Sequence, residues 1–332
     1  MADDRQQSTR FGPSGSRRRV LAAAALAPVL AGLPTRAGAL PAGPGDGAPV
    51  EPVMTEPADW ADVGKALGRT GDMRRFMYHT GFPRWDLTVF SRGIRVDPAL
   101  ALGTHVSFVR YADHSTFLMG DTVVTERELQ SFIDVLLRYG IEPTAIHKHL
   151  LAHEPAVWWV HVHAHGHDPV AVARGLRAAL ERTGTPLDRP LAVSPPEDLD
   201  IAAIDTALGV KGYADDSIYR CTYVRRETIV DGRMTLPPGL GATSAVGFQP
   251  LGGGRAALSG DLAVVAHEVQ PALTALRRGG IELVELHHHN LTDEPRLFFV
   301  HYWAVGDALS LARGLRPAVD TTNVVPMHGG VI

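Results

Sequence analysis

The chain has 332 residues, of which 45% are hydrophobic and 20% charged, which is typical of a folded globular protein with one large or two modest cores. Its formal net charge is −4, and no segment gathers the Lys and Arg side chains that bind phosphate backbones, so nucleic acid is excluded as an expected partner. Cys221 is the single cysteine, which excludes an internal disulfide framework and a cysteine-based zinc site. Any metal site must therefore use imidazole and carboxylate ligands, for which the chain offers 16 histidines.

Residues 1–39 are predicted to form a signal peptide of the twin-arginine type. Residues 16–21 read Ser-Arg-Arg-Arg-Val-Leu, an apolar run extends from Val20 to Leu33, and small residues at 37–39 suit cleavage. Twin-arginine signals export proteins that are already folded, and an ordinary Sec signal is the alternative. The apolar run is shorter than the roughly 20 residues that span a bilayer, and no later segment is long enough. We therefore expect a secreted or cell-envelope protein without stable membrane insertion.

After a Pro- and Gly-rich flexible linker over residues 40–58, the chain consists of two copies of one module. Gly120-Asp121 recurs as Gly260-Asp261, and each pair is expected to end a strand before a helix, where the Asp accepts backbone hydrogen bonds. Further pairs in the same register are Gly140 and Gly280, His147 and His287, His149 and His289, Glu154 and Glu294, and His161 and His301. The predicted organisation is a module over 59–184, a Pro-rich linker over 185–199, a module over 200–322 and a tail over 323–332.

In chain order, the first module is predicted to contain a strand, a helix, two strands and a second helix. The first helix starts at Thr125 with Glu128 three residues later, which is the pattern of a capping box. The expected elements are a strand over 117–124, a helix over 125–139, strands over 144–150 and 157–164, a helix over 169–181, and an additional strand over 106–111. We expect an α+β fold of two tandem ferredoxin-like (strand-helix-strand-strand-helix) modules, packed sheet to sheet around a His-lined cleft. A single continuous barrel is the alternative.

Histidines dominate one face of the later strands of the first module. Alternate residues of a strand share a face, so His147 and His149 point the same way, as do His161 and His163. The opposite face of the second of these strands is apolar and should meet the helices, which places the histidines between the repeats. Imidazoles on two adjacent antiparallel strands provide a three- or four-nitrogen cage for a transition metal, with Zn favoured and Cu, Fe or Ni as alternatives. His163 or Glu154, at the turn, could complete the shell or act in catalysis, for example as a base on a bound water.

The second module repeats part of this pattern. His287, His289 and His301 are the corresponding metal ligands, but Trp303 replaces His163. We therefore expect that one copy is catalytic and the other structural.

Three functions are compatible with these residues. A metal-dependent enzyme, either a hydrolase or an oxidoreductase, would act on a small molecule at the histidines of the first module. A binding module would hold an envelope glycan or a metabolite in a cleft lined by Trp159, Phe299 and Trp303, because aromatic rings suit sugars. A metal buffer would bind metal in both repeats without a substrate. The sequence leaves the oligomeric state open.

The combined pattern of Gly-Asp, Gly-Ile-Glu, His-x-His, an aromatic-rich strand with His, and Leu-Ala-Arg-Gly-Leu-Arg resembles the LppY/LpqO family of bacterial envelope proteins. The resemblance covers nearly the whole mature chain and implies a duplicated domain of unknown function outside the cytoplasm. Family members typically carry His-Asn-His where this chain has His147-Lys148-His149 and His287-His288-His289, so the outer histidines match and the middle residue differs. The acylated cysteine of the lipoproteins that name the family is absent here.

Overall fold

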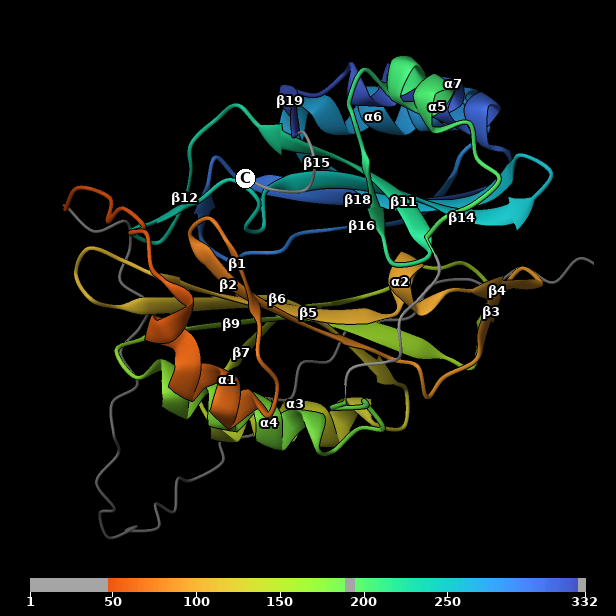
Figure 1. The fold of residues 1–332 in the computed structure, drawn as a ribbon. Coiled ribbons are helices and arrows are strands. Elements are labelled where there is room, and N and C mark those ends of the chain that lie inside the picture. The colour runs from red at the N-terminus through yellow and green to blue at the C-terminus, as the bar shows by residue number, and fades with distance from the viewer. Residues whose placement is uncertain (1–46, 189–194, 328–332) are drawn as a thin grey trace, which may run out of the picture. The chain divides into compact units, whose positions relative to one another are not determined.

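The computed structural model describes residues 47–188 and 195–327 (Figure 1). The predicted signal peptide, residues 40–46 of the predicted linker, and residues 189–194 and 328–332 lie outside the described residues. Within the described ranges the chain is a mixed α+β protein, as predicted, and every strand ladder in it is antiparallel.

The first repeat contains short elements followed by long strands and two longer helices. Its elements are η1 (Pro57–Trp60), α1 (Ala61–Leu67), β1 (Asp72–Arg74), β2 (Met77–Pro83), β3 (Val89–Ser91), β4 (Ile94–Val96), α2 (Pro98–Ala101), β5 (Gly103–Arg110), β6 (Thr116–Thr125), α3 (Leu129–Arg138), β7 (Glu142–His147), β8 (His153–Glu154), β9 (Val157–Gly166) and α4 (Pro169–Leu180). The predicted elements over 106–111, 117–124, 125–139, 144–150, 157–164 and 169–181 correspond to β5, β6, α3, β7, β9 and α4, with shifted ends.

The second repeat follows the same order, except that its described part has no counterpart of η1 or α2 and adds a final strand. Its elements are α5 (Ile201–Leu208), β10 (Tyr213–Asp215), β11 (Ile218–Arg225), β12 (Ile229–Asp231), β13 (Met234–Leu236), β14 (Thr243–Gly252), β15 (Arg255–Val265), α6 (Ala266–Arg278), β16 (Glu282–His287), β17 (Asp293–Glu294), β18 (Leu297–Asp307), α7 (Ala308–Val319) and β19 (Val324–Met327).

Each repeat forms one large sheet and one small sheet. The large sheets have the orders β1-β2-β5-β6-β9-β7 and β10-β11-β14-β15-β18-β16, and β19 adds to the second sheet by pairing with β11. In the first sheet β9 lies between β6 and β7, but β1, β2 and β5 precede this unit, so the module is larger than the ferredoxin-like unit that was expected. No ladder within 47–188 and 195–327 joins the two large sheets, so the continuous barrel is not formed there.

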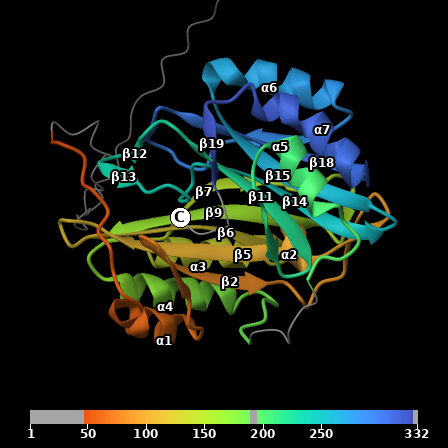
Figure 2. The ribbon, with the colours of Figure 1, turned by 45° about the horizontal axis from the view of Figure 1, so that its top comes forward.

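Helices cover the outer face of each large sheet, and the inner faces of the two sheets pack against each other. Figure 1 shows α1, α3 and α4 on one side and α5, α6 and α7 on the other, and Figure 2 shows the same layers from a tilted direction. Two apolar clusters lie between sheet and helices within single repeats. Two further clusters combine residues of both repeats, for example Met119 with Phe299, and Trp159 with Trp303. The interior between the sheets is therefore shared by the two repeats.

A buried ion pair fixes the start of the first long helix in the second repeat. The side chain of Arg225 is 1% exposed and donates to the carboxylate of Glu268 at 2.5 and 3.2 Å. The same carboxylate accepts the backbone N–H groups of Val265 at 3.0 Å and of Asn323 at 2.9 Å. Glu268 thus ties β11, the start of α6 and the turn after α7 together.

The first repeat has the corresponding ion pair between Arg84 and Glu128. Arg84 donates to the Glu128 carboxylate at 2.9 and 3.1 Å, and the backbone N–H of Thr125 donates to it at 2.7 Å. The Glu128 half of the predicted capping box is therefore present. The helix nevertheless starts at Leu129 rather than at Thr125, and residues 126–128 form a turn before it.

Candidate metal centre between the two repeats

The predicted metal-ligating histidines lie on the inner faces of the two sheets. His161 is in β9 between Val160 and Val162, which point into the helix-side core, so strand alternation turns His161 inward. His147, His161, His289 and His301 are at most 9% exposed, and His149 and His287 are partly buried. The structure joins the three ligands predicted in each copy into one cluster of six histidines.

The six imidazole rings form one continuous stack that an aromatic ring closes at each end. Neighbouring ring centroids are 3.3–4.9 Å apart, and the two rings at the centre, His147 and His287, are 4.0 Å apart. The order of the stack is Trp159, His149, His301, His287, His147, His161, His289 and Phe299. Each half of the stack contains residues of both repeats. Replacing every residue by its counterpart in the other repeat gives the same stack, read from its other end.

Two hydrogen bonds cross between the repeats beside this stack. The hydroxyl of Thr144 donates to the backbone oxygen of His289 at 2.6 Å, and the backbone N–H of Lys148 donates to the carboxylate of Glu285 at 2.7 Å. These contacts hold β7 and the residues after it against the second repeat, and they position both His-x-His pairs.

The strand histidines are oriented by backbone carbonyl groups. The Nδ1 atom of His301 lies 3.3 Å from the carbonyl oxygen of Gly260, and His161 makes the equivalent hydrogen bond to the backbone of Gly120. A ring that donates from Nδ1 presents the lone pair of Nε2. The Nε2 atoms of both rings are buried and have no hydrogen-bond partner within the described part of the chain. Metal-bound histidines are commonly oriented in this way by a hydrogen bond from the second ring nitrogen.

The repeated Gly-Asp pairs serve this site. They lie inside β6 and β15 rather than at strand ends before helices, so that expectation was wrong. A Cβ atom on Gly120 would lie 2.6 Å from the backbone oxygen of His105, and one on Gly260 would collide with the backbone oxygen of Ala245. Glycine is therefore required for the close approach of the strands.

The aspartates of these pairs bring carboxylates to the histidines. Asp121 is the cross-strand neighbour of His161, and its Oδ2 atom lies 3.1 Å from Nε2 of His149. Asp261 is the cross-strand neighbour of His301. Burial between the sheets raises the pKa of Asp121 and raises that of Asp261 to about 7. Sequence reasoning missed both as site residues. A usable signal was present, because each Asp recurs at the same distance before the histidines in both repeats.

The imidazoles are held in the form that binds metal. Burial lowers the pKa of His149 to about 3 and that of His161 to about 4. Burial and the neighbouring histidines also lower the pKa values of His147, His289 and His301 well below the ordinary value. These rings are therefore neutral at pH 7 and do not need to lose a charge-bearing proton before they coordinate a metal.

Three groups of potential ligand atoms lie within 4.8 Å of one another among the described residues. They are His147, His287 and His301; His161, His287 and His289; and Asp121, His147 and His161. Imidazole nitrogens with a carboxylate suit Zn, Cu, Ni and Fe, so the chemistry of the donors fits the predicted transition metal. Three-ligand groups also leave coordination positions for water or a substrate.

The two residues predicted to be catalytic do not join these groups. Glu154 is exposed on β8, and its backbone pairs with Phe90, so it faces solvent rather than the histidines. His163 is buried and points inward, with Nδ1 3.7 Å from a carboxylate oxygen of Asp231 and its ring against Phe117. The carboxylate that the structure brings to the histidines is that of Asp121, because it projects from a strand inside the sheet rather than from a turn.

The three aromatic residues expected to line a ligand cleft are buried. Trp159 and Phe299 are 0% exposed and Trp303 is 1% exposed. The indole N–H of Trp159 donates to the backbone oxygen of Ala101 at 2.8 Å, and its ring stacks on His149. Trp159 and Phe299 close the ends of the histidine stack, and none of the three forms an open platform for a sugar.

The cluster is accessible on one side. The side chain of Asp121 is 19% exposed and that of His149 is 17% exposed, and they lie in contact with each other. His105, the cross-strand neighbour of Asp121 on β5, is exposed. The edge of the cluster formed by Asp121 and His149 is therefore partly exposed to solvent.

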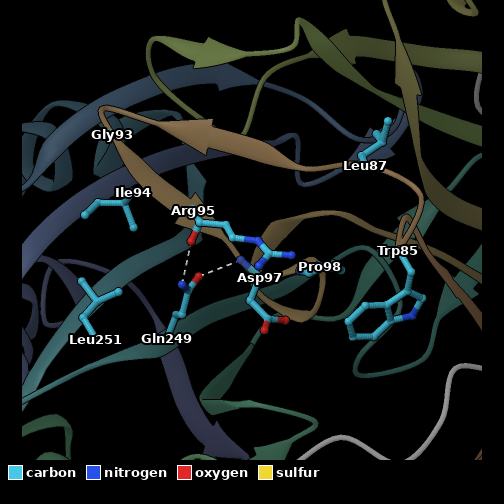
Figure 3. Close-up of a pocket in the computed structure, with 9 residues that line it drawn as sticks. All are labelled: Trp85, Leu87, Gly93, Ile94, Arg95, Asp97, Pro98, Gln249 and Leu251. Atoms are coloured by element: carbon cyan, nitrogen blue, oxygen red, sulfur yellow. Dashed lines mark hydrogen bonds between the residues drawn. The ribbon is translucent and has the colours of Figure 1, made fainter.

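A separate pocket of about 400 Å³ lies where β3, β4 and α2 of the first repeat meet β14 (Figure 3). Its lining includes Trp85, Arg95, Asp97 and Gln249, and no histidine. The Gln249 side chain donates to the backbone oxygen of Arg95 and accepts the backbone N–H of Asp97, both at 2.8 Å, so it fixes the pocket wall.

None of the helices in the described ranges is both long and apolar enough to cross a membrane.

Comparisons with curated proteins and with solved structures give no basis for assigning a function. A comparison with curated proteins finds no significant match. Among solved structures, a double-ringed trimeric shell protein from the RMM microcompartment aligns at 15% identity over 62% of this chain and 81% of that chain, with a TM-score of 0.19. The trimeric bacterial microcompartment shell protein PduB aligns at 11% identity over 78% of this chain and 96% of that chain, also with a TM-score of 0.19. These TM-scores are too low to support an argument about fold or function.

One family model matches the chain twice, over residues 61–182 and 202–321. The two matches together cover more than half of the chain and coincide with the two repeats, which shows the duplicated domain of unknown function that the sequence resemblance implied. The chain therefore belongs to the family described as Domain of Unknown Function (DUF1259), of which it carries two copies.

Proposed function

We propose that this protein is an exported, metal-dependent enzyme that acts on a small molecule at the histidine cluster between its repeats. The observation that carries the proposal is the pair of buried, unpartnered Nε2 atoms of His161 and His301, each held by a backbone hydrogen bond through Nδ1. A buried nitrogen lone pair without a partner costs about 1–3 kcal/mol, and a bound metal ion removes that cost. Zinc is the metal we propose, because the donors are imidazole and carboxylate.

The access to the cluster supports catalysis rather than storage. A site that only stores metal needs no opening, whereas Asp121 and His149 are both partly exposed. Asp121 lies beside the histidines and is the carboxylate that acts as base toward a substrate or water there. When bound, the metal supplies Lewis acidity, and Asp121 moves the proton.

The test is elemental analysis of untagged protein together with two double variants. We expect one or two equivalents of a single transition metal in the unaltered protein and none in His161→Ala/His301→Ala. The matched control is His165→Ala/His167→Ala, which removes two exposed histidines at the end of the same strand region and should keep the metal. Far-UV circular dichroism checks that all variants are folded. Absence of metal in the unaltered protein would refute the proposal.

Export belongs to the same proposal, and so does the relation to the LppY/LpqO envelope proteins. The supporting observation is the order of three arginines, an apolar run and small residues within positions 1–39. Fractionation of the native host should find the protein outside the cytoplasm, and replacement of the arginines at 17–19 by lysine should retain it inside. Processing that is insensitive to this change would favour the Sec route.

A second candidate function is the binding of an envelope glycan or metabolite in the pocket of Figure 3. An indole face next to a guanidinium and a carboxylate suits a sugar, and Trp85, Arg95 and Asp97 provide these groups. Titration with soluble oligosaccharides, followed by tryptophan fluorescence, tests this function. Binding that Trp85→Ala abolishes and His161→Ala/His301→Ala preserves would support a binding module. A metal buffer would instead show bound metal with neither turnover nor ligand binding.

A further inference from the structure

We propose that the cluster holds two metal ions, each bound by the His-x-His pair of one repeat and the strand histidine of the other repeat. This inference rests on the proposed function, because it requires that the histidines bind metal. The two sets of ligands, called triad A and triad B, are His287, His289 and His161 for triad A, and His147, His149 and His301 for triad B.

The two triads have nearly the same shape. In triad A the ring centroids of the His-x-His pair are 5.2 Å apart, and their distances to the third ring, His161, are 5.6 and 3.9 Å. In triad B the corresponding distances are 4.8 Å within the pair, and 5.3 and 4.0 Å to His301. Exchange of the repeats therefore converts one triad into the other.

The ligand atoms of triad A are close enough for one ion, and members of triad B also lie close to one another. The three nitrogens offered by triad A lie within 4.8 Å of one another. In triad B, Nε2 of His147 is 2.8 Å from Nε2 of His149, and His147 and His301 are together in another group within 4.8 Å. A hydrogen bond joins these two nitrogens, and a metal ion would take the place of its proton.

One ion cannot use the whole cluster. A zinc ion binds four ligands at about 2.0–2.1 Å for histidine nitrogen, so at least two of the six rings would stay unligated. The described residues already leave buried nitrogens of His161, His287 and His301 without partners. Two ions with three histidine ligands each would engage all six rings.

The charge of the site also fits one ion in each triad. Asp121 is the cross-strand neighbour of His161 in triad A, and Asp261 is the cross-strand neighbour of His301 in triad B. One carboxylate therefore lies opposite the strand histidine of each triad, and Asp121 also contacts His149 of triad B. These carboxylates offset part of the charge of the ions, which reduces the repulsion between two buried dications.

The test is the zinc stoichiometry of the full chain. Metal-free protein is loaded with Zn²⁺, freed of excess metal by gel filtration and titrated against a chromophoric chelator. We expect two zinc ions per chain in the unaltered protein, one in His289→Ala, one in His149→Ala and none in the double variant. His288→Ala is the matched control, because this histidine is adjacent to both members of the pair but is outside the ring stack, and it should keep two ions.

A second measurement uses only the unaltered protein, in case a variant does not fold. Cu²⁺ is added stepwise, and electron paramagnetic resonance is recorded after each step. A spin-coupled half-field signal that grows between the first and second equivalents supports two neighbouring ions. Binding that stops at one equivalent of zinc, or a second copper without coupling, overturns the inference while the proposed function stands. Zero metal in the unaltered protein contradicts the proposed function itself.

Discussion

Removal of the buried carboxylate of Glu268 should destabilise the protein strongly. The Glu268→Ala variant leaves Arg225, 1% exposed, with Glu227 as its remaining charged partner. It also leaves the N–H groups of Val265 and Asn323 without their acceptor. Loss of one member of a buried ion pair costs about 3–5 kcal/mol, and the retained Glu227 keeps the cost near the lower end. The two lost backbone hydrogen bonds add about 1 kcal/mol each, so we expect a decrease of about 4–5 kcal/mol in the free energy of unfolding.

Urea unfolding followed by circular dichroism measures this decrease. The matched control is Glu181→Ala, which breaks the ion pair with Arg177 at the surface, where the Glu181 side chain is 55% exposed. Exposed pairs contribute at most about 1 kcal/mol, so this variant should be close to the unaltered protein. Glu128→Ala, in the first repeat, should cost less than Glu268→Ala because its carboxylate is 18% rather than 5% exposed. Equal, small effects of Glu268→Ala and Glu181→Ala would refute the argument.

Three further outcomes are expected. The pKa values of His149 and His161 are lowered to about 3 and 4, so the unfolded chain binds more protons than the folded chain below about pH 6.5. Metal-free protein should therefore lose stability as the pH falls from 6.5 toward 4, by up to about 1.4 kcal/mol per unit of pKa shift. Equal urea midpoints at pH 7 and pH 5 would contradict this. Gly260→Ala should lower the free energy of unfolding by about 2 kcal/mol or more and weaken metal binding, because its Cβ collides with a neighbouring strand. Gly166→Ala, with open space around its Cβ, should be nearly neutral in the same urea unfolding experiment. Burial raises the pKa of Cys221 to about 12, so a thiol reagent should label it only after unfolding, and rapid labelling of native protein would show an open core.

The sequence predicted the repeat, the α+β class and the inward direction of the histidines, because these follow from local patterns. Strand alternation is enough to place His161 on the face opposite Val160 and Val162. It also placed His147 and His149 on one face, and the structure brings both rings into the stack.

The joining of the two sets of histidines was not predictable in this way. It depends on how the second sheet packs over the first, which local alternation does not determine. The role of Asp121 was missed because Gly120-Asp121 was interpreted as a strand end, while the pair continues through the middle of β6. Glu154 was selected from its nearness to the histidines along the chain, but the turn carries its side chain to the surface.

The mixed composition of triads A and B bears on how such a chain arose. A single copy of the module carries two of the three histidines of one triad and only one histidine of the other triad. Two identical copies related by a twofold axis between His147 and His287 would complete both triads, so the ancestral form that this arrangement implies is a homodimer of single modules. Two copies joined in one chain can differ in sequence, whereas the subunits of a homodimer cannot. The replacement of His163 by Trp303 at equivalent positions is a divergence that a symmetric dimer could not carry.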